Sequence, residues 1–158
     1  MLTESMEDYL EIIFRLIQEK GYVRAVDIAE AIRVQPSSVT RMIQKLDEGG
    51  YIHYQKYRNI ALSDKGRRLG YFLVWRDAML KEFFTLFEIK IGIEEQVEGI
   101  EHYITPATMC LFRDLVLFFR TYPEQMEKLR QISQANSYPE GEQLQELRAW
   151  LFRHSNDE

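Results

Sequence analysis

The sequence predicts a mainly α-helical protein, with an N-terminal winged helix-turn-helix that carries a small β-hairpin wing and is followed by an all-α region. Three observations predict this fold class. Apolar residues recur at helical spacing along most of the chain, and the break Arg33-Val-Gln-Pro36 separates two short helical segments. After Gly49-Gly50, the β-prone stretches 51–54 and 59–62 are spaced as a hairpin.

Bulk composition excludes several classes of protein. The chain has 158 residues, of which 46% are apolar, so it can bury a core. No apolar run approaches the roughly 20 residues that a membrane span needs, and the start lacks a basic and apolar leader, so we expect a cytoplasmic protein without membrane contact. The single cysteine, Cys110, cannot build a Cys-rich site, and we expect it to be buried. Any metal must therefore bind to Asp, Glu and His.

Charge is segregated along the chain although the net charge is -5. Residues 20–70 carry ten basic and five acidic side chains, which gives +5, whereas the segments on either side sum to -10. A local basic block can attract nucleic acid phosphates even in an acidic protein. The alternative is simply two solvated regions of different composition.

The basic block contains the elements of a winged helix-turn-helix that could contact DNA, and we call this unit the reading head. An amphipathic helix over 5–19 precedes a short helix over 26–32, and a third helix begins at Ser37-Ser38 and ends at the paired glycines. Short hydroxyl, amide and basic side chains on the third helix and the wing tip can contact phosphates and base edges. The predicted DNA-binding residues are Ser37, Ser38, Thr40, Arg41, Gln44, Lys45, Lys56, Tyr57 and Arg58. A polar surface helix without this role is the alternative.

The rest of the chain reads as helices. We expect a fourth helix from Ser63-Asp64 to Phe87, a fifth over 93–104, and a sixth capped by Thr105-Pro106 and ending at Phe119. Two more are predicted over 123–132 and 139–154. This region is too apolar for one small winged helix to cover, which favours a homodimer. We therefore expect a DNA-binding domain at 1–70, and at 71–158 a metal-binding and dimerisation domain with a helical extension.

Two helix faces carry possible metal ligands. Glu98, Glu101 and His102 lie at i, i+3 and i+4 of the fifth helix, and Asp8 and Glu11 lie at i and i+3 of the first. Oxygen-rich sets of this kind suit Mn²⁺ or Fe²⁺. The ordinary alternatives are that Glu11 pairs with Arg15 and that the fifth-helix group is a solvated face.

Taken together, these motifs resemble the DtxR family of metalloregulators, and specifically its manganese-responsive MntR branch, over roughly residues 3–120. The matching stretches are Ser5-Met-Glu-Asp-Tyr9 with Glu11, Asp27-Ile-Ala-Glu-Ala31, Pro36-Ser-Ser-Val-Thr40 with Gln44-Lys-Leu46, Lys56-Tyr-Arg58, Lys65-Gly66 and Val97-Glu-Gly-Ile-Glu-His102. The resemblance implies a dimer that binds palindromic operator DNA and represses metal-uptake genes when the ion is plentiful. It also implies a two-ion site, hence two Mn²⁺ per subunit, with Fe²⁺ as an alternative ion.

Carried over by motif, the family's ligands fall on Asp8, Glu11, Glu98, Glu101 and His102. One position departs, because the branch has a histidine where Asp77 follows Trp75-Arg76 here. We expect Asp77 to be the sixth ligand, since carboxylate can replace imidazole; the alternative is that it pairs with Lys81 one turn on. His102 is then the only nitrogen donor, which predicts a site tilted towards Mn²⁺ and away from Zn²⁺.

The sequence also predicts how metal acts. Without it, Asp8, Glu11, Asp77, Glu98 and Glu101 would repel one another, so the reading head should be loosely held.

Two other functions are weighed against this one. A dinuclear metallohydrolase would use similar ligands, but the chain shows no nucleophile or phosphate loop, so we expect no enzyme activity. A winged-helix regulator that has lost metal sensing is the second alternative.

Overall fold

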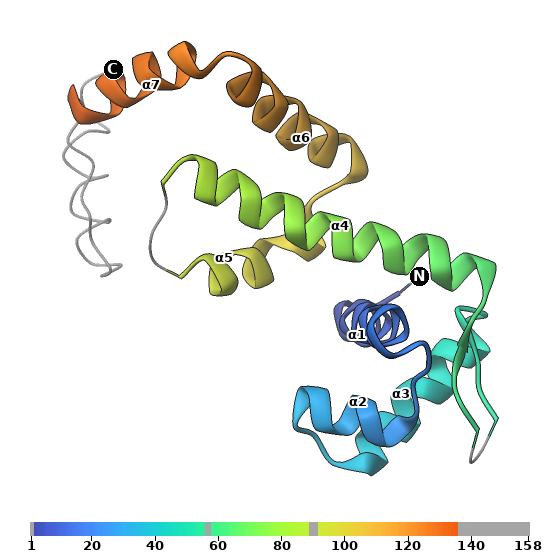
Figure 1. Cartoon of the computed structure of the whole chain (residues 1–158). Helices are drawn as coiled ribbons and strands as arrows, with labels where there is room; N and C mark the ends of the chain where they lie inside the picture. The colour runs from blue at the N-terminus through green and yellow to red at the C-terminus, as the bar shows by residue number, and fades with distance from the viewer. Residues whose placement is uncertain (1, 56–57, 89–91, 136–158) are drawn as a thin grey trace.

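The computed structural model describes residues 2–55, 58–88 and 92–135, and Figure 1 shows an almost entirely helical chain. In chain order the elements are α1 (Glu4–Lys20), α2 (Ala25–Ile32), α3 (Pro36–Glu48), β1 (Ile52–His53), β2 (Ala61–Leu62), α4 (Asp64–Leu86), α5 (Ile93–Ile100), the 3₁₀ turn η1 (Glu101–Tyr103), α6 (Pro106–Thr121) and α7 (Pro123–Ala135). The predicted fold class is confirmed. The helix predicted over 139–154 lies outside the described residues.

The first core joins α1, α2, α3 and the hairpin to the first half of α4. β1 and β2 pair antiparallel, with Ile52 opposite Leu62, and an isolated bridge between Val23 and Ile60 ties the segment between α1 and α2 to the wing. Alternation places Ile52 and Leu62 inside and His53 outside, as a half-buried hairpin requires. The wing is therefore fixed to the reading head by apolar packing as well as by strand pairing.

The break between α2 and α3 is a tight turn. Arg33 adopts a left-handed conformation with φ 54°, which ends α2, and Pro36 occupies the first turn of α3, where its missing N–H costs nothing. Val39, Ile43 and Leu46 then point into the core. The opposite face of α3 is left free at the surface.

Helix α4 connects two cores. Leu73 belongs to the first core, whereas Leu80 packs with Val97 of α5 and Met109 of α6 in a second core. Against α1, Gly70 allows close approach, because a Cβ there would lie 2.7 Å from a ring carbon of Phe14. The domain division predicted at residue 70 falls inside α4 and stays a prediction.

Two expectations are wrong in detail. The fifth helix does not run to residue 104: α5 ends at Ile100, and Glu101–Tyr103 forms a 3₁₀ turn before Thr105, whose extended backbone suits the following proline. Cys110 is exposed on α6, not buried. Within the described ranges, no helix has the length and apolarity to cross a membrane.

Candidate metal centre and nucleic-acid surface

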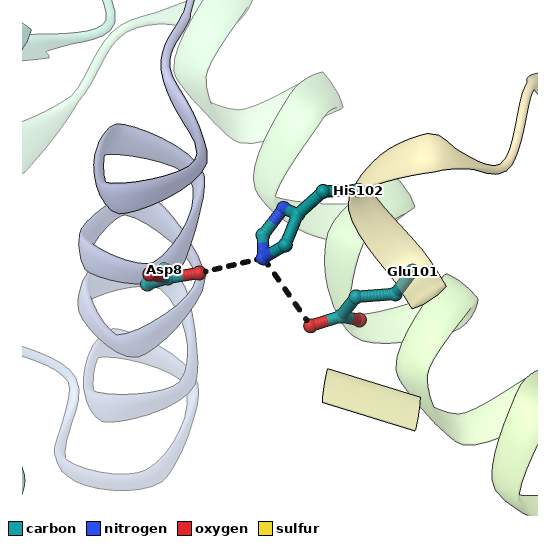
Figure 2. Close-up of side chains that lie close together, drawn as sticks. All are labelled: Asp8, Glu101 and His102. Atoms are coloured by element: carbon teal, nitrogen blue, oxygen red, sulfur yellow. Dashed lines mark ion pairs between the residues drawn. The ribbon is translucent and has the colours of Figure 1, made fainter. Parts of the chain in front are cut away.

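Three of the predicted ligands converge between α1 and η1. Asp8, Glu101 and His102 each offer a ligand atom, and these atoms all lie within 4.8 Å of one another. His102 Nε2 lies 3.1 Å from Asp8 Oδ1 and 3.9 Å from Glu101 Oε1, and Figure 2 shows its ring between the two carboxylates. One imidazole nitrogen and two carboxylates at this spacing can surround a divalent ion.

The other ring nitrogen of His102 is held by Glu7. His102 Nδ1 lies 2.9 Å from Glu7 Oε2, and Arg76 Nη1 donates to the same oxygen at 2.9 Å. A carboxylate that accepts from Nδ1–H fixes the ring tautomer and leaves Nε2 able to bind a metal. Glu7 and Arg76 therefore orient the imidazole towards Asp8 and Glu101.

A buried pair lies behind this cluster. Arg76 and Glu101 are only 3% and 4% exposed, and Arg76 Nε lies 3.4 Å from Glu101 Oε2. Neither atom makes a hydrogen bond to the residues that the structure describes. Burial raises the pKa of Glu101 to about 7, although the charge of Arg76 opposes the shift. A buried carboxylate whose Oε1 faces an oriented imidazole, with Asp8 on the other side of the ring, fits a divalent cation.

The pKa values of the neighbouring groups, His102 and Asp8, are also shifted by burial and nearby charges. Burial lowers the pKa of His102, but the hydrogen bond to Glu7 and the charge of Asp8 outweigh it, so the pKa is raised overall. The pKa of Asp8 is also raised, mainly by burial, with His102 opposing and Glu98 and Glu11 adding to the shift. Each carboxylate is thus destabilised in its charged form, which a bound cation would reverse.

The other three predicted ligands line a cavity of about 440 Å³ that Asp8 and Glu101 also line. Its lining includes Asp8, Glu11, Asp77, Glu94, Glu98 and Glu101 together with Arg15 and Lys81. Arg15 Nη2 lies 2.7 Å from Glu11 Oε1 and 2.7 Å from Asp77 Oδ2, and Lys81 Nζ lies 2.9 Å from Asp77 Oδ1. Both pairings weighed as alternatives in the sequence are therefore present in the structure, whereas Glu98 is exposed.

These ion pairs change the expected electrostatics. The carboxylates do not stand unopposed, because Arg15, Lys81 and Arg76 each contact at least one of them. The reading head is consequently tied to α4 by protein charges even without metal. The expectation of a loosely held reading head, based on repulsion alone, overlooked these cations.

Two site residues were missed by the sequence reading. Glu7 precedes Asp8 and stands one turn before Glu11 on α1, which is a detectable spacing. Arg76 interrupts the apolar stripe of α4 between Leu73 and Leu80, and a basic residue in such a stripe must be paired if it is buried. Their partner, His102, lies far along the chain, so only the fold identifies the contact.

The predicted DNA-contacting face is exposed. Ser37, Ser38, Arg41, Gln44 and Lys45 are at the surface of α3, and Arg58 is exposed beside the wing. Thr40 is half-buried, and its hydroxyl donates to the Pro36 carbonyl one turn earlier in α3, at 3.0 Å. Lys56 and Tyr57 lie outside the described residues. The face therefore keeps most of the predicted donors available to a groove.

Comparisons with known proteins agree with this arrangement. The family model for the iron dependent repressor, N-terminal DNA-binding domain, matches residues 1–60. The HTH-type transcriptional regulator MntR of Shouchella clausii (strain KSM-K16) is 46% identical over 143 residues, covering 90% of this chain and all of that protein. The regulator of the same name from Geobacillus kaustophilus (strain HTA426) is 46% identical over 145 residues, covering 89% of this chain and all of that protein.

Among solved structures, one described as a manganese-dependent transcriptional repressor in complex with manganese superimposes with a TM-score of 0.60 at 27% identity. The match covers 72% of this chain and 53% of that one, so this chain spans about half the length of the solved protein. A winged helix-turn-helix with an exposed polar third helix and an adjoining carboxylate–histidine cluster defines a DNA-binding transcriptional regulator. The chain belongs to the DtxR family of such regulators, within its MntR branch. Membership of this family excludes the metallohydrolase alternative.

Proposed function

We propose that the chain is a cytoplasmic, manganese-responsive repressor of metal-uptake genes that binds palindromic operator DNA as a homodimer. One observation carries the proposal: Asp8 comes from the reading head, Glu101 and His102 come from the turn before α6, and their ligand atoms lie within 4.8 Å. A divalent ion held by these residues supplies positive charge that joins the two parts of the molecule.

The chain's own residues explain how a bound metal would affect DNA binding. Glu7 and Arg76 keep His102 facing Asp8, so the ligand set is prepared before an ion arrives. An ion shared by Asp8 and Glu101 would add a link between α1 and η1 to the ion pairs that already join α1 to α4. A fixed α1 fixes α3, and this lowers the ordering cost of binding DNA.

The exposed face of α6 supports the proposed homodimer. Leu111, Leu117 and Phe118 are 59%, 52% and 45% exposed on one helix, which favours a second copy of the chain as its cover. In such a dimer, two α3 helices held about 34 Å apart would meet successive major grooves on one side of the duplex. That spacing matches a palindromic operator.

Metal preference follows from the donor set. With Asp77 as a carboxylate, His102 is the only nitrogen donor among the proposed ligands Asp8, Glu11, Asp77, Glu98, Glu101 and His102. Oxygen-rich sites favour Mn²⁺ over Zn²⁺ more than nitrogen-rich sites do. Fe²⁺, with similar size and charge, is the alternative ion. Capacity for two ions depends on whether Glu11, Asp77 and Glu98 are free to bind the second.

A gel-shift experiment tests the proposal. Duplexes selected from a random pool with Mn²⁺ present serve as the probe, and wild type should bind them with Mn²⁺ but not with EDTA. His102→Ala should lose the metal dependence and bind at least tenfold more weakly, whereas Tyr103→Ala, a truncation of the exposed neighbour in the same turn, should not. Binding unaffected by EDTA would instead support a regulator without metal sensing, and failure to select any duplex would contradict DNA binding.

A further inference from the structure

Asp77 is fully engaged by protein cations. Its Oδ2 accepts from Arg15 at 2.7 Å and its Oδ1 pairs with Lys81 at 2.9 Å, so both carboxylate oxygens already face a positive charge. The side chain is 14% exposed, which limits the competition from water. A carboxylate with two such partners is not available to a metal ion unless at least one partner leaves.

The same two cations also engage the neighbouring acids. Arg15 Nε donates to Glu11 Oε1 at 2.9 Å, and Lys81 pairs with Glu94 of α5. Arg15 therefore joins α1 to α4, and Lys81 joins α4 to α5. These are the connections that a second ion, bound among Glu11, Asp77 and Glu98, would otherwise supply.

The acidic site has two halves, Asp8–Glu101–His102 and Glu11–Asp77–Glu98, and they differ in their contacts with protein cations. In the half formed by Asp8, Glu101 and His102, Nε2 faces two carboxylates, and Glu101 Oε2 makes no hydrogen bond to any described residue. The nearest protein cation, Arg76, stays behind Glu101 and Glu7. In the other half, Arg15 and Lys81 stand between the acids themselves. Both oxygens of Asp77 are therefore engaged by a protein cation, whereas Asp8 and His102 Nε2 contact no Arg or Lys side chain among the described residues.

We infer that Arg15 and Lys81 are built-in counter-ions of the second half, so that each subunit binds one divalent ion at Asp8, Glu101 and His102 instead of two. This inference rests on the proposed metal response, and it alters both the ion count that the family resemblance implies and the proposed ligand set, from which it removes Glu11, Asp77 and Glu98 in the wild type. Asp77 then acts as the partner of Arg15 and Lys81 in the wild type and becomes available as a metal ligand when these cations are removed. The second interhelical link is provided by the protein permanently.

Counting bound ions tests the inference directly. Full-length chain is stripped with EDTA and dialysed against Mn²⁺, and free Mn²⁺ is measured by its electron paramagnetic resonance signal. Wild type should bind one ion per subunit, and the double variant Arg15→Gln/Lys81→Gln should bind two. The affinity of the double variant for the second ion should be about tenfold or more above that of wild type, because two repelling cations are gone. Adding Asp77→Ala to the double variant should remove the second ion, whereas Asp77→Ala alone should leave the single ion of the wild type unchanged.

A matched control separates this effect from general charge. Arg120 Nη2 lies 2.7 Å from Glu82 Oε1, an equally short ion pair between α6 and α4 outside the cavity. Arg120→Gln should still bind one ion. Two ions of similar affinity in wild type, one ion in the double variant, or a second ion gained by Arg120→Gln would each overturn the inference while leaving the proposed function intact. No bound Mn²⁺ in any variant would overturn both.

Discussion

Glu101 is the residue at which burial and charge conflict most sharply. It is almost inaccessible to water, its Oε2 makes no hydrogen bond to the described residues, and its pKa is raised to about 7 from an ordinary 4.5. Arg76 opposes that shift without cancelling it. In the metal-free protein this carboxyl therefore holds its proton across a pH range in which an unfolded chain has released it.

Stability should consequently fall with pH in EDTA. Between about 4.5 and about 7 the folded chain binds more protons at Glu101 than the unfolded chain does, so the free energy of unfolding decreases as pH rises. His102 acts in the same direction, since its raised pKa gives stability that is present below 6.5 and lost above its folded value. The free energy of unfolding, measured with urea, should fall between about pH 5 and about pH 8 in both proteins. The fall should be smaller in Glu101→Gln than in wild type, by on the order of 2 kcal/mol. Parallel pH profiles for the two proteins would contradict the shift.

The same proton competes with metal. Because a ligand carboxylate must be deprotonated, Mn²⁺ affinity should increase as pH rises through the pKa of Glu101. The sequence could identify Glu101 as a candidate ligand from its spacing to Glu98 and His102, but not its burial. The burial of Glu101 could not be predicted because its buried partner, Arg76, is 25 positions earlier in the chain and on another helix.

At the scale of elements, the helices follow their sequence signals closely. Gly21 ends α1 in a left-handed conformation, and Thr105 caps α6 by accepting from the Thr108 amide. The 3₁₀ turn at Glu101–Tyr103 could not be distinguished, because residues at i and i+3 share a face in both kinds of helix. The ligand pattern was therefore recognisable even though the helix type was wrong.

Helix α6 carries the prediction that belongs to this scale. Leu117→Asp places a charge on its exposed apolar face and should convert the dimer to a monomer, which sedimentation velocity would measure. Tyr71→Asp is the matched control, since Tyr71 is a similarly exposed large side chain, 64% accessible, on α4. A wild type that sediments as a monomer, or a Leu117→Asp variant that stays dimeric, would rule out this face as the interface.

Over the whole molecule, α4 is the element that both halves share. Its first half closes the core of the reading head and its second half packs on α5 and α6. The sequence predicted both helical regions, their order and the convergence of acids with His102. It did not predict how Arg15 and Lys81 partition the acidic site, because Arg15 and Asp77 are 62 positions apart and meet only through the packing of α1 on α4.

The central claim is that metal bound between α1 and η1 and DNA bound at α3 stabilise the same arrangement of the chain. Thermodynamic linkage then requires that each ligand strengthen the binding of the other by the same factor. The most direct measurement is the Mn²⁺ affinity of the wild type with and without a saturating operator duplex. The account predicts tighter binding with the duplex, by roughly 5- to 150-fold, and equal affinities would contradict it.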